Sequence, residues 1–124
     1  MRTHAKPGDL TEADLRAYPA VEREPVCGPY REWRVCSMGP PSSGAVAVLQ
    51  ILGLLERTDF ARAPPESEAG LHFFAEAGKL AYADRARYLG DPDFVTPPVV
   101  KLLERTYLGK GASPDEIVDA IRIV

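Results

Sequence analysis

The sequence predicts an α+β fold that is mainly helical, with one β-hairpin and four to five helices. Between Glu24 and Met38, two short runs of β-forming residues flank a polar pair, which is typical of a hairpin. After Met38, apolar residues recur at helical spacing between capping residues and prolines. The chain has 124 residues, of which 45% are hydrophobic and 27% charged, so we expect a single domain over residues 1–124.

The first predicted element is a short helix over residues 12–18. Thr11 has a side chain that can cap a helix N-terminus, and Glu12 and Asp14 place acidic groups in the first turn. Pro19 cannot continue the helix, so the helix ends before it.

The predicted hairpin brings together the only two cysteines of the chain. If Tyr30 pairs with Trp33, counting outward places Cys27 opposite Cys36, and cross-strand neighbours can lie close enough for a disulfide in some pleat geometries. Arg-Glu at residues 31–32 is an unfavourable two-residue turn, which makes this register insecure. We therefore expect two small, half-buried thiols, with the disulfide as the alternative.

Two serines follow the hairpin and precede a long apolar run. A serine nucleophile needs a nearby general base, and neither histidine nor lysine lies in the local sequence. Ser42 and Ser43 are instead residue types that cap helices. We expect one of them to cap a helix over residues 44–56, which is apolar over most of its circumference and therefore buried on several sides.

Three more helices are predicted downstream, over residues 67–88 with Ser67 as the cap, over residues 98–107, and over residues 113–124. The first of these contains a charged run at residues 84–87. Such a run is usually a solvated helix face or an ion pair that fixes the helix end, so we expect one of these two roles.

Few residues point to a metal or a cofactor. His4 and His72 lie too far from each other and from the cysteines for a zinc-site spacing, and we expect His72 to be a packed helix histidine. Asp91 and Asp93 supply fewer oxygens than calcium requires, so a turn is expected there. We expect no catalytic, cofactor-binding or metal-binding residue among the 124.

Charge and hydropathy argue against nucleic acid and against a membrane as partners of this chain. The 15 basic residues are scattered among 18 acidic ones, for a net charge of -3, which is not typical of a nucleic-acid-binding protein. The apolar run over residues 45–55 is too short to span a bilayer, and the first ten residues do not resemble a secretory signal. We expect the chain to remain in the cytoplasm when it is expressed alone.

Three ordered segments resemble the γ-glutamyltransferase (γ-glutamyltranspeptidase) family over residues 8–107. The first is GDLTEADLRAY. The second is the PPPSSGG signature between hairpin and helix, which reads GPPSSGA at residues 39–45, and the third is A-[FY]-A-D-R-x-x-Y-L-G-D-P-D-F at residues 81–94. Gly39 for Pro and Ala45 for Gly are small departures, whereas Glu32 stands where the family favours Gly in the hairpin.

The resemblance implies the late large-subunit region of an N-terminal-nucleophile hydrolase, made as a precursor that cuts itself into a large and a small subunit. Such enzymes transfer the γ-glutamyl group of glutathione or a similar compound to water or an amino acid, and they are typically periplasmic or extracellular. The family's nucleophile is the threonine at the N-terminus of the small subunit. The five threonines of this chain do not match its sequence context: Thr3, Thr11, Thr58, Thr96 and Thr106.

Two hypotheses for function follow. In the first, the chain is a fragment of a γ-glutamyltransferase whose partner is the rest of that enzyme, including the small subunit, and it is inactive alone. In the alternative, it is a non-enzymatic truncated paralogue that binds itself or another partner. We expect the isolated chain to self-associate, as a two-fold dimer or a soluble aggregate, because the helix over residues 44–56 would expose apolar faces once its covering segments are lost.

Overall fold

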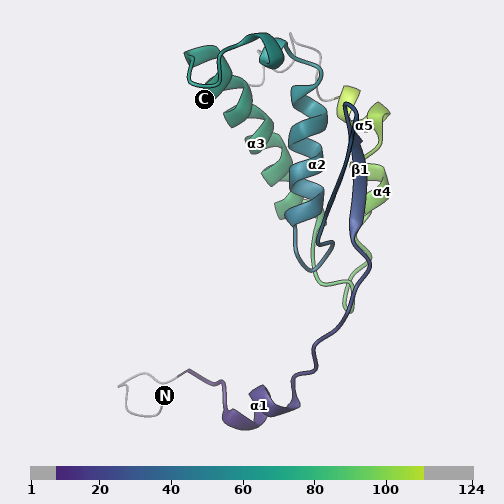
Figure 1. The fold of residues 1–124 in the computed structure, drawn as a ribbon. Helices are drawn as coiled ribbons and strands as arrows, with labels where there is room; N and C mark the ends of the chain where they lie inside the picture. The colour runs from purple at the N-terminus through teal and green to yellow at the C-terminus, as the bar shows by residue number, and fades with distance from the viewer. Residues whose placement is uncertain (1–7, 111–124) are drawn as a thin grey trace.

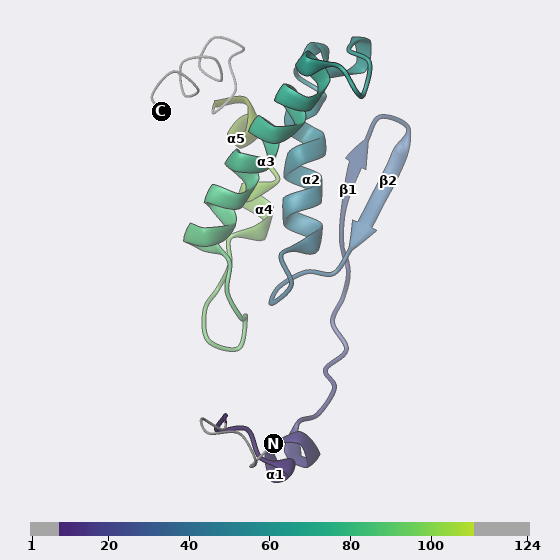
Figure 2. The same ribbon diagram turned by 90° about the vertical axis from the view of Figure 1, so that its left-hand side faces the viewer.

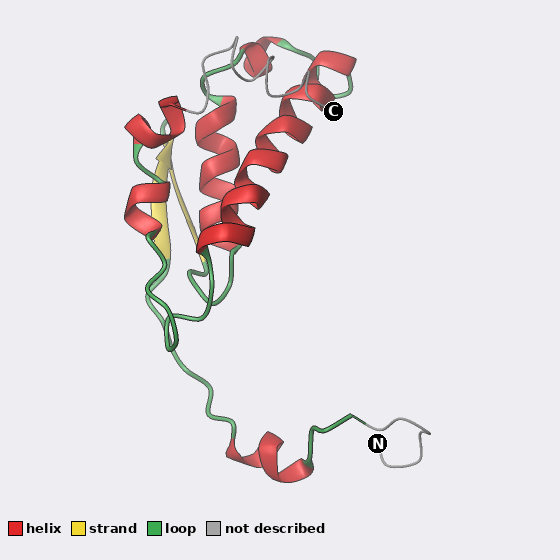
Figure 3. Cartoon of the chain, turned by 180° about the vertical axis from the view of Figure 1, so that it is seen from behind, coloured by secondary structure: helices red, strands yellow, loops and turns green. Residues whose placement is uncertain are grey.

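The computed structural model describes residues 8–110 and confirms the mixed α+β class. In chain order its elements are α1 (Glu12–Ala17), β1 (Val26–Tyr30), β2 (Trp33–Ser37), α2 (Gly44–Leu55), the 3-10 helix η1 (Asp59–Arg62), α3 (Glu68–Tyr88), α4 (Val99–Leu102) and α5 (Arg105–Lys110). Helix α2 lies between the hairpin and α3, as Figures 1 and 2 show. Seen from behind, α4 and α5 lie beside the hairpin (Figure 3). Helix α1 stands apart from this body, at the end of an extended segment (Figure 1).

The hairpin has the predicted register, with Tyr30 opposite Trp33 and Cys27 opposite Cys36. Its turn places Arg31 in the left-handed region, at a φ of 53°. The Arg31 amide donates a hydrogen bond of 2.8 Å to the side chain of Glu56, at the end of α2. A contact from a distant helix therefore supports a turn that the local sequence does not favour.

The expectation of free thiols is wrong, because Cys27 and Cys36 form a disulfide. In an antiparallel ladder, hydrogen-bonded pairs alternate with closer, non-hydrogen-bonded pairs. Pro29, opposite Arg34, has no N–H to donate and so belongs to a non-hydrogen-bonded pair. The cysteine pair lies two residues further along each strand, so it is also a non-hydrogen-bonded pair. Its Cα atoms are 4.1 Å apart.

Helix α2 begins at Gly44 as predicted, but only one of the two serines helps to cap it. The Ser42 hydroxyl oxygen accepts a hydrogen bond of 3.2 Å from the Gly44 amide, and the Ala45 amide donates to the Met38 carbonyl at 3.0 Å. Ser43 occupies the N-cap position without a side-chain capping bond. Its hydroxyl oxygen instead accepts a 2.9 Å bond from Nε of Arg85, so the prediction that one of the two serines caps the helix is confirmed at Ser42.

The expectation that α2 would expose apolar faces holds at Val48, which is 42% exposed, but not for most of the helix. The hairpin approaches α2 closely at Gly28, where an added Cβ would lie 3.0 Å from the Leu49 side chain. On another side, α5 approaches at Gly53, where an added Cβ would lie 2.7 Å from Leu108. The buried residues of α2 are Ala45, Val46, Ala47, Leu49, Gln50, Leu54 and Leu55.

Helix α3 matches its prediction, and the Ser67 hydroxyl oxygen accepts the expected capping bond from the Gly70 amide at 3.1 Å. The helix predicted over residues 98–107 is interrupted, since α4 ends at Leu102 and α5 begins at Arg105. In an uninterrupted helix the Leu102 carbonyl would bond to a backbone amide one turn on, but here it accepts from the Gln50 side chain. The helix predicted over residues 113–124 lies outside the described residues.

Candidate functional site

The only polar residue of α2 lies at the centre of the body. Gln50 is 2% exposed, and its side-chain amide donates to Asp84 Oδ2 at 2.7 Å and to the Leu102 carbonyl at 3.3 Å. Its other polar atom, Oε1, is buried and has no hydrogen-bond partner among the described residues. Gln50 therefore joins α2 to both α3 and α4.

Asp84 completes this arrangement from α3. Its two carboxylate oxygens accept from the Tyr107 hydroxyl at 2.8 and 3.0 Å, which brings in α5. We call Gln50, Asp84 and Tyr107 the polar junction. The prediction for residues 84–87 holds for Arg85 and Arg87, which are exposed, but is wrong for Asp84, which is half-buried and bonded inside the body.

The polar junction keeps Tyr107 protonated. Burial, the hydrogen bond to Asp84 and the charge of Asp84 raise the pKa of Tyr107 to about 12. A phenol with this pKa is a poor general base near neutral pH, so the junction is suited to holding four helices together rather than to transferring protons. A cavity of about 370 Å³ adjoins it, lined by Gln50, Leu54, Leu80, Ala81, Ala83, Asp84, Tyr107 and Leu108.

A larger cleft, of about 640 Å³, lies between β1 and the α4–α5 pair, with α2 as its floor. Charged residues at one end include Arg57 and Arg105. The Arg57 guanidinium donates to the Arg105 carbonyl at 2.6 Å, and the Arg105 guanidinium lies 3.8 Å from the Glu56 carboxylate. These contacts tie α5 to the end of α2, and they include no hydroxyl or thiol nucleophile.

The structure does not bring the sequence-predicted candidates together into a reactive site. Ser43 is paired with the guanidinium of Arg85, which cannot accept its proton. His72 is exposed, not packed as expected, and its ring centre lies 6.3 Å from that of Phe73. His4 lies outside the described residues.

The acidic loop forms the predicted turn. The Phe94 amide donates to the Asp91 carbonyl at 3.0 Å, and both Asp91 and Asp93 face Arg23, with a shortest separation of 3.1 Å to Asp93. Over residues 8–110, no group of three or more histidine, cysteine or acidic residues is arranged to hold a metal ion. No helix in this range is long and apolar enough to cross a membrane.

The sequence interpretation missed all three residues of the polar junction as a group. Gln50 carried a signal, because it is the one polar residue in the apolar run over residues 45–55. A glutamine on a helix that is apolar nearly all round must be buried with partners, which predicts a polar contact but not its identity.

Residues 1–114 match the family model of gamma-glutamyltranspeptidase. The chain belongs to this family. It is 49% identical over 100 residues to the glutathione hydrolase proenzyme of Escherichia coli, covering 81% of this chain and 17% of that protein. It is 40% identical over 103 residues to the acylase ACY 1 proenzyme of Pseudomonas sp. strain SE83, covering 83% of this chain and 18% of that protein.

The fold is also similar to a solved member of the family. The crystal structure of Helicobacter pylori gamma-glutamyltranspeptidase matches with a TM-score of 0.74 and 41% identity, over 92% of this chain and 31% of that one. The chain thus spans less than a fifth of the two curated relatives and about a third of this solved chain.

Proposed function

We propose that this chain is the late large-subunit segment of a γ-glutamyltransferase of the N-terminal-nucleophile hydrolase class, and that it serves as a scaffold. The complete enzyme would transfer the γ-glutamyl group of glutathione or a similar compound to water or an amino acid. In this proposal the nucleophilic threonine belongs to the small subunit, outside these residues, and residues 1–124 form one structural segment.

One observation carries the scaffold role. The same stretch of about 100 residues is shared with a protein named as a glutathione hydrolase and with one named as an acylase, at 49% and 40% identity. A segment common to proteins named for different reactions is better suited to supporting a site than to selecting its substrate.

The chemistry of the described residues agrees with this role. Among residues 8–110, the serine and threonine hydroxyls that form hydrogen bonds do so with backbone groups, with Asp14 or with Arg85, and none is paired with a histidine or lysine that could act as a base. Both cysteines are in the disulfide. In the polar junction, the Gln50 amide, the Asp84 carboxylate and the Tyr107 hydroxyl all form bonds that join helices.

The first test measures the 124-residue chain alone. We expect neither self-cleavage nor hydrolysis of a γ-glutamyl anilide, because the nucleophile and the oxyanion donors belong to other parts of the enzyme. Turnover by the highly purified chain that is lost on substitution of Ser42 or Ser43 would overturn the proposal.

The second test transplants residues 8–107 into the Escherichia coli proenzyme in place of its matching segment. We expect the chimera to cleave itself and to keep the donor preference of its host. A chimera that matures but takes on a different donor preference would show that the segment selects substrate, and the scaffold role would then be wrong.

A further inference from the structure

The N-terminal arm, residues 8–25, contains a helix that nothing in the described structure covers. All six residues of α1 are exposed. Its polar bonds are complete, since the Thr11 hydroxyl oxygen accepts from the Asp14 amide at 3.3 Å and the Asp14 carboxylate accepts from the Thr11 amide at 2.8 Å. Isolated helices shorter than about 12 residues are marginal in water even with good caps. A six-residue helix therefore requires a packing partner.

The arm also carries apolar side chains that face solvent. Leu15 is 62% exposed, Tyr18 81% and Val21 59%. Leu15 and Tyr18 are three residues apart, so they share one side of the helix end. Tyrosine is enriched among the residues that contribute most to buried interfaces, and Leu15 adds apolar area beside it.

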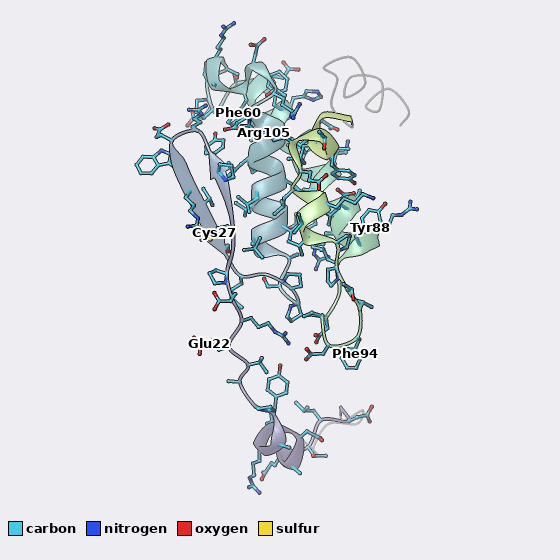
Figure 4. All side chains as sticks on the ribbon, turned by 90° about the vertical axis from the view of Figure 1, so that its right-hand side faces the viewer. Glu22, Cys27, Phe60, Tyr88, Phe94 and Arg105 are labelled. Carbon is cyan, nitrogen blue, oxygen red and sulfur yellow. A yellow bond between two sulfur atoms is a disulfide. The ribbon has the colours of Figure 1, made fainter. Side chains whose placement is uncertain are left out.

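This apolar surface continues onto the body. Arg23 fixes the base of the arm, because its guanidinium lies 3.1 Å from both carboxylate oxygens of Asp93. A hollow of about 480 Å³ at this junction is lined in part by Tyr18, Val21, Met38 and Phe94. Phe94 is 87% exposed, at the end of the loop nearest the arm (Figure 4). We call Leu15, Tyr18, Val21, Met38 and Phe94 the arm surface.

The extent of the match to the Helicobacter pylori structure indicates which part of the enzyme could cover the arm surface. The Helicobacter pylori structure matches 92% of this chain, which leaves about ten residues unmatched, fewer than the arm contains. The match therefore extends into the arm, so part of the arm has a counterpart in an enzyme whose chain is about three times longer. Most of that longer chain lies outside the matched segment and is available to pack against the arm.

We propose that the arm surface is an interface that docks onto an apolar face of the remaining part of the γ-glutamyltransferase large subunit, with Leu15 and Tyr18 as its anchors. The inference rests on the proposed function. It adds that α1, which its capping box makes only marginally helical in the chain alone, becomes stable when that part is present.

The test uses one double variant, which carries both Leu15→Asp and Tyr18→Asp, and measures it in two settings. In the 124-residue chain we expect no change in the denaturant midpoint, because the Leu15 and Tyr18 side chains are mostly exposed there. In the chimera with the Escherichia coli proenzyme we expect about a tenfold loss of mature, self-cleaved enzyme. Arg16→Ala is the matched control, since Arg16 lies on the same helix, contacts only Glu12, and should leave both settings unchanged.

The outcomes separate this inference from the proposed function. Failure of the chimera with an unaltered arm to mature would count against the scaffold proposal. Normal maturation of both the unaltered and the Asp variants would overturn the docking of the arm.

A second measurement needs only the 124-residue chain. We expect trypsin to cut rapidly after Arg16 at every protein concentration, because no residue in the range 8–110 covers α1. Protection that rises with concentration, and that the Asp variant abolishes, would assign the arm surface to a second copy of the chain and overturn the proposed partner.

Discussion

The arm and the body both contain capped helices, but only the body contains the partners that its helices need. In the arm, the Thr11 capping box is complete while every residue of α1 is exposed. In the body, α2 has a weaker cap and no acidic residue in its first turn, yet seven of its twelve residues are buried. The difference teaches that a cap determines where a helix begins, whereas packing determines whether it is stable.

The largest expected effect comes from breaking the polar junction. Asp84→Ala removes the acceptor of the half-buried Tyr107 hydroxyl and the shorter of the two bonds of the buried Gln50 amide, which keeps only its 3.3 Å bond to the Leu102 carbonyl. We expect the free energy of unfolding to fall by about 3 kcal/mol, since hydrogen bonds to a charged group contribute about 1.5–3 kcal/mol each and are not fully additive. Denaturant unfolding measures this. Arg87→Ala, on the exposed side of the same turn, is the control and should change little.

The disulfide is expected to have the next largest effect. Replacing both cysteines by serine should lower stability by about 2–3 kcal/mol, because a short closed loop restricts the unfolded chain. The loss should appear in the unfolding of the body and should leave the arm unaffected. An unchanged midpoint under reducing conditions would mean that the Glu56 bond to Arg31 and the packing on α2 hold the hairpin without it.

Short sequence patterns predicted the helices and the hairpin, but they did not predict the long-range contacts of the polar junction. The helix caps at Thr11 and Ser67 and the cysteine register depend on residues a few positions apart, and all three were confirmed. The polar junction joins Gln50 to a residue 34 positions away and Asp84 to one 23 positions away, and no local pattern specifies such pairs.

Two of the departures from prediction, the break between α4 and α5 and the disulfide, have the same origin. The break between α4 and α5 occurs where the Leu102 carbonyl bonds to Gln50, which helical periodicity does not reveal. The disulfide was identified as an alternative but not preferred, because its register depends on a turn supported from outside the hairpin. Tertiary contacts thus decided what propensity left open.

The two serines before α2 test the cap within the body. Ser42→Ala removes the acceptor for the Gly44 amide and should cost about 0.5–1 kcal/mol, the range for a lost N-terminal bond. Ser43→Ala removes only the bond to exposed Arg85 and should change the denaturant midpoint by less. Equal losses would show that the Ser43 position contributes to the helix start in a way that its hydrogen bonds do not indicate.

The smallest effect is expected in the arm, and it depends on pH. Hydrogen bonds from the Thr11 side chain and backbone hold the pKa of Asp14 below its ordinary value of 3.8. Because the folded pKa is lowered, the capping box stabilises α1 above pH 3.8, and this contribution is lost as the pH falls through the lowered pKa. The chemical shifts of residues 12–17 should therefore lose their helical character at acid pH in the wild type, while Asp14→Ala should lack that character at neutral pH as well. Since α1 contributes no packing to the body, Asp14→Ala should leave the denaturant midpoint at neutral pH unchanged, and a shift in that midpoint would show that the arm and the body are coupled within this chain.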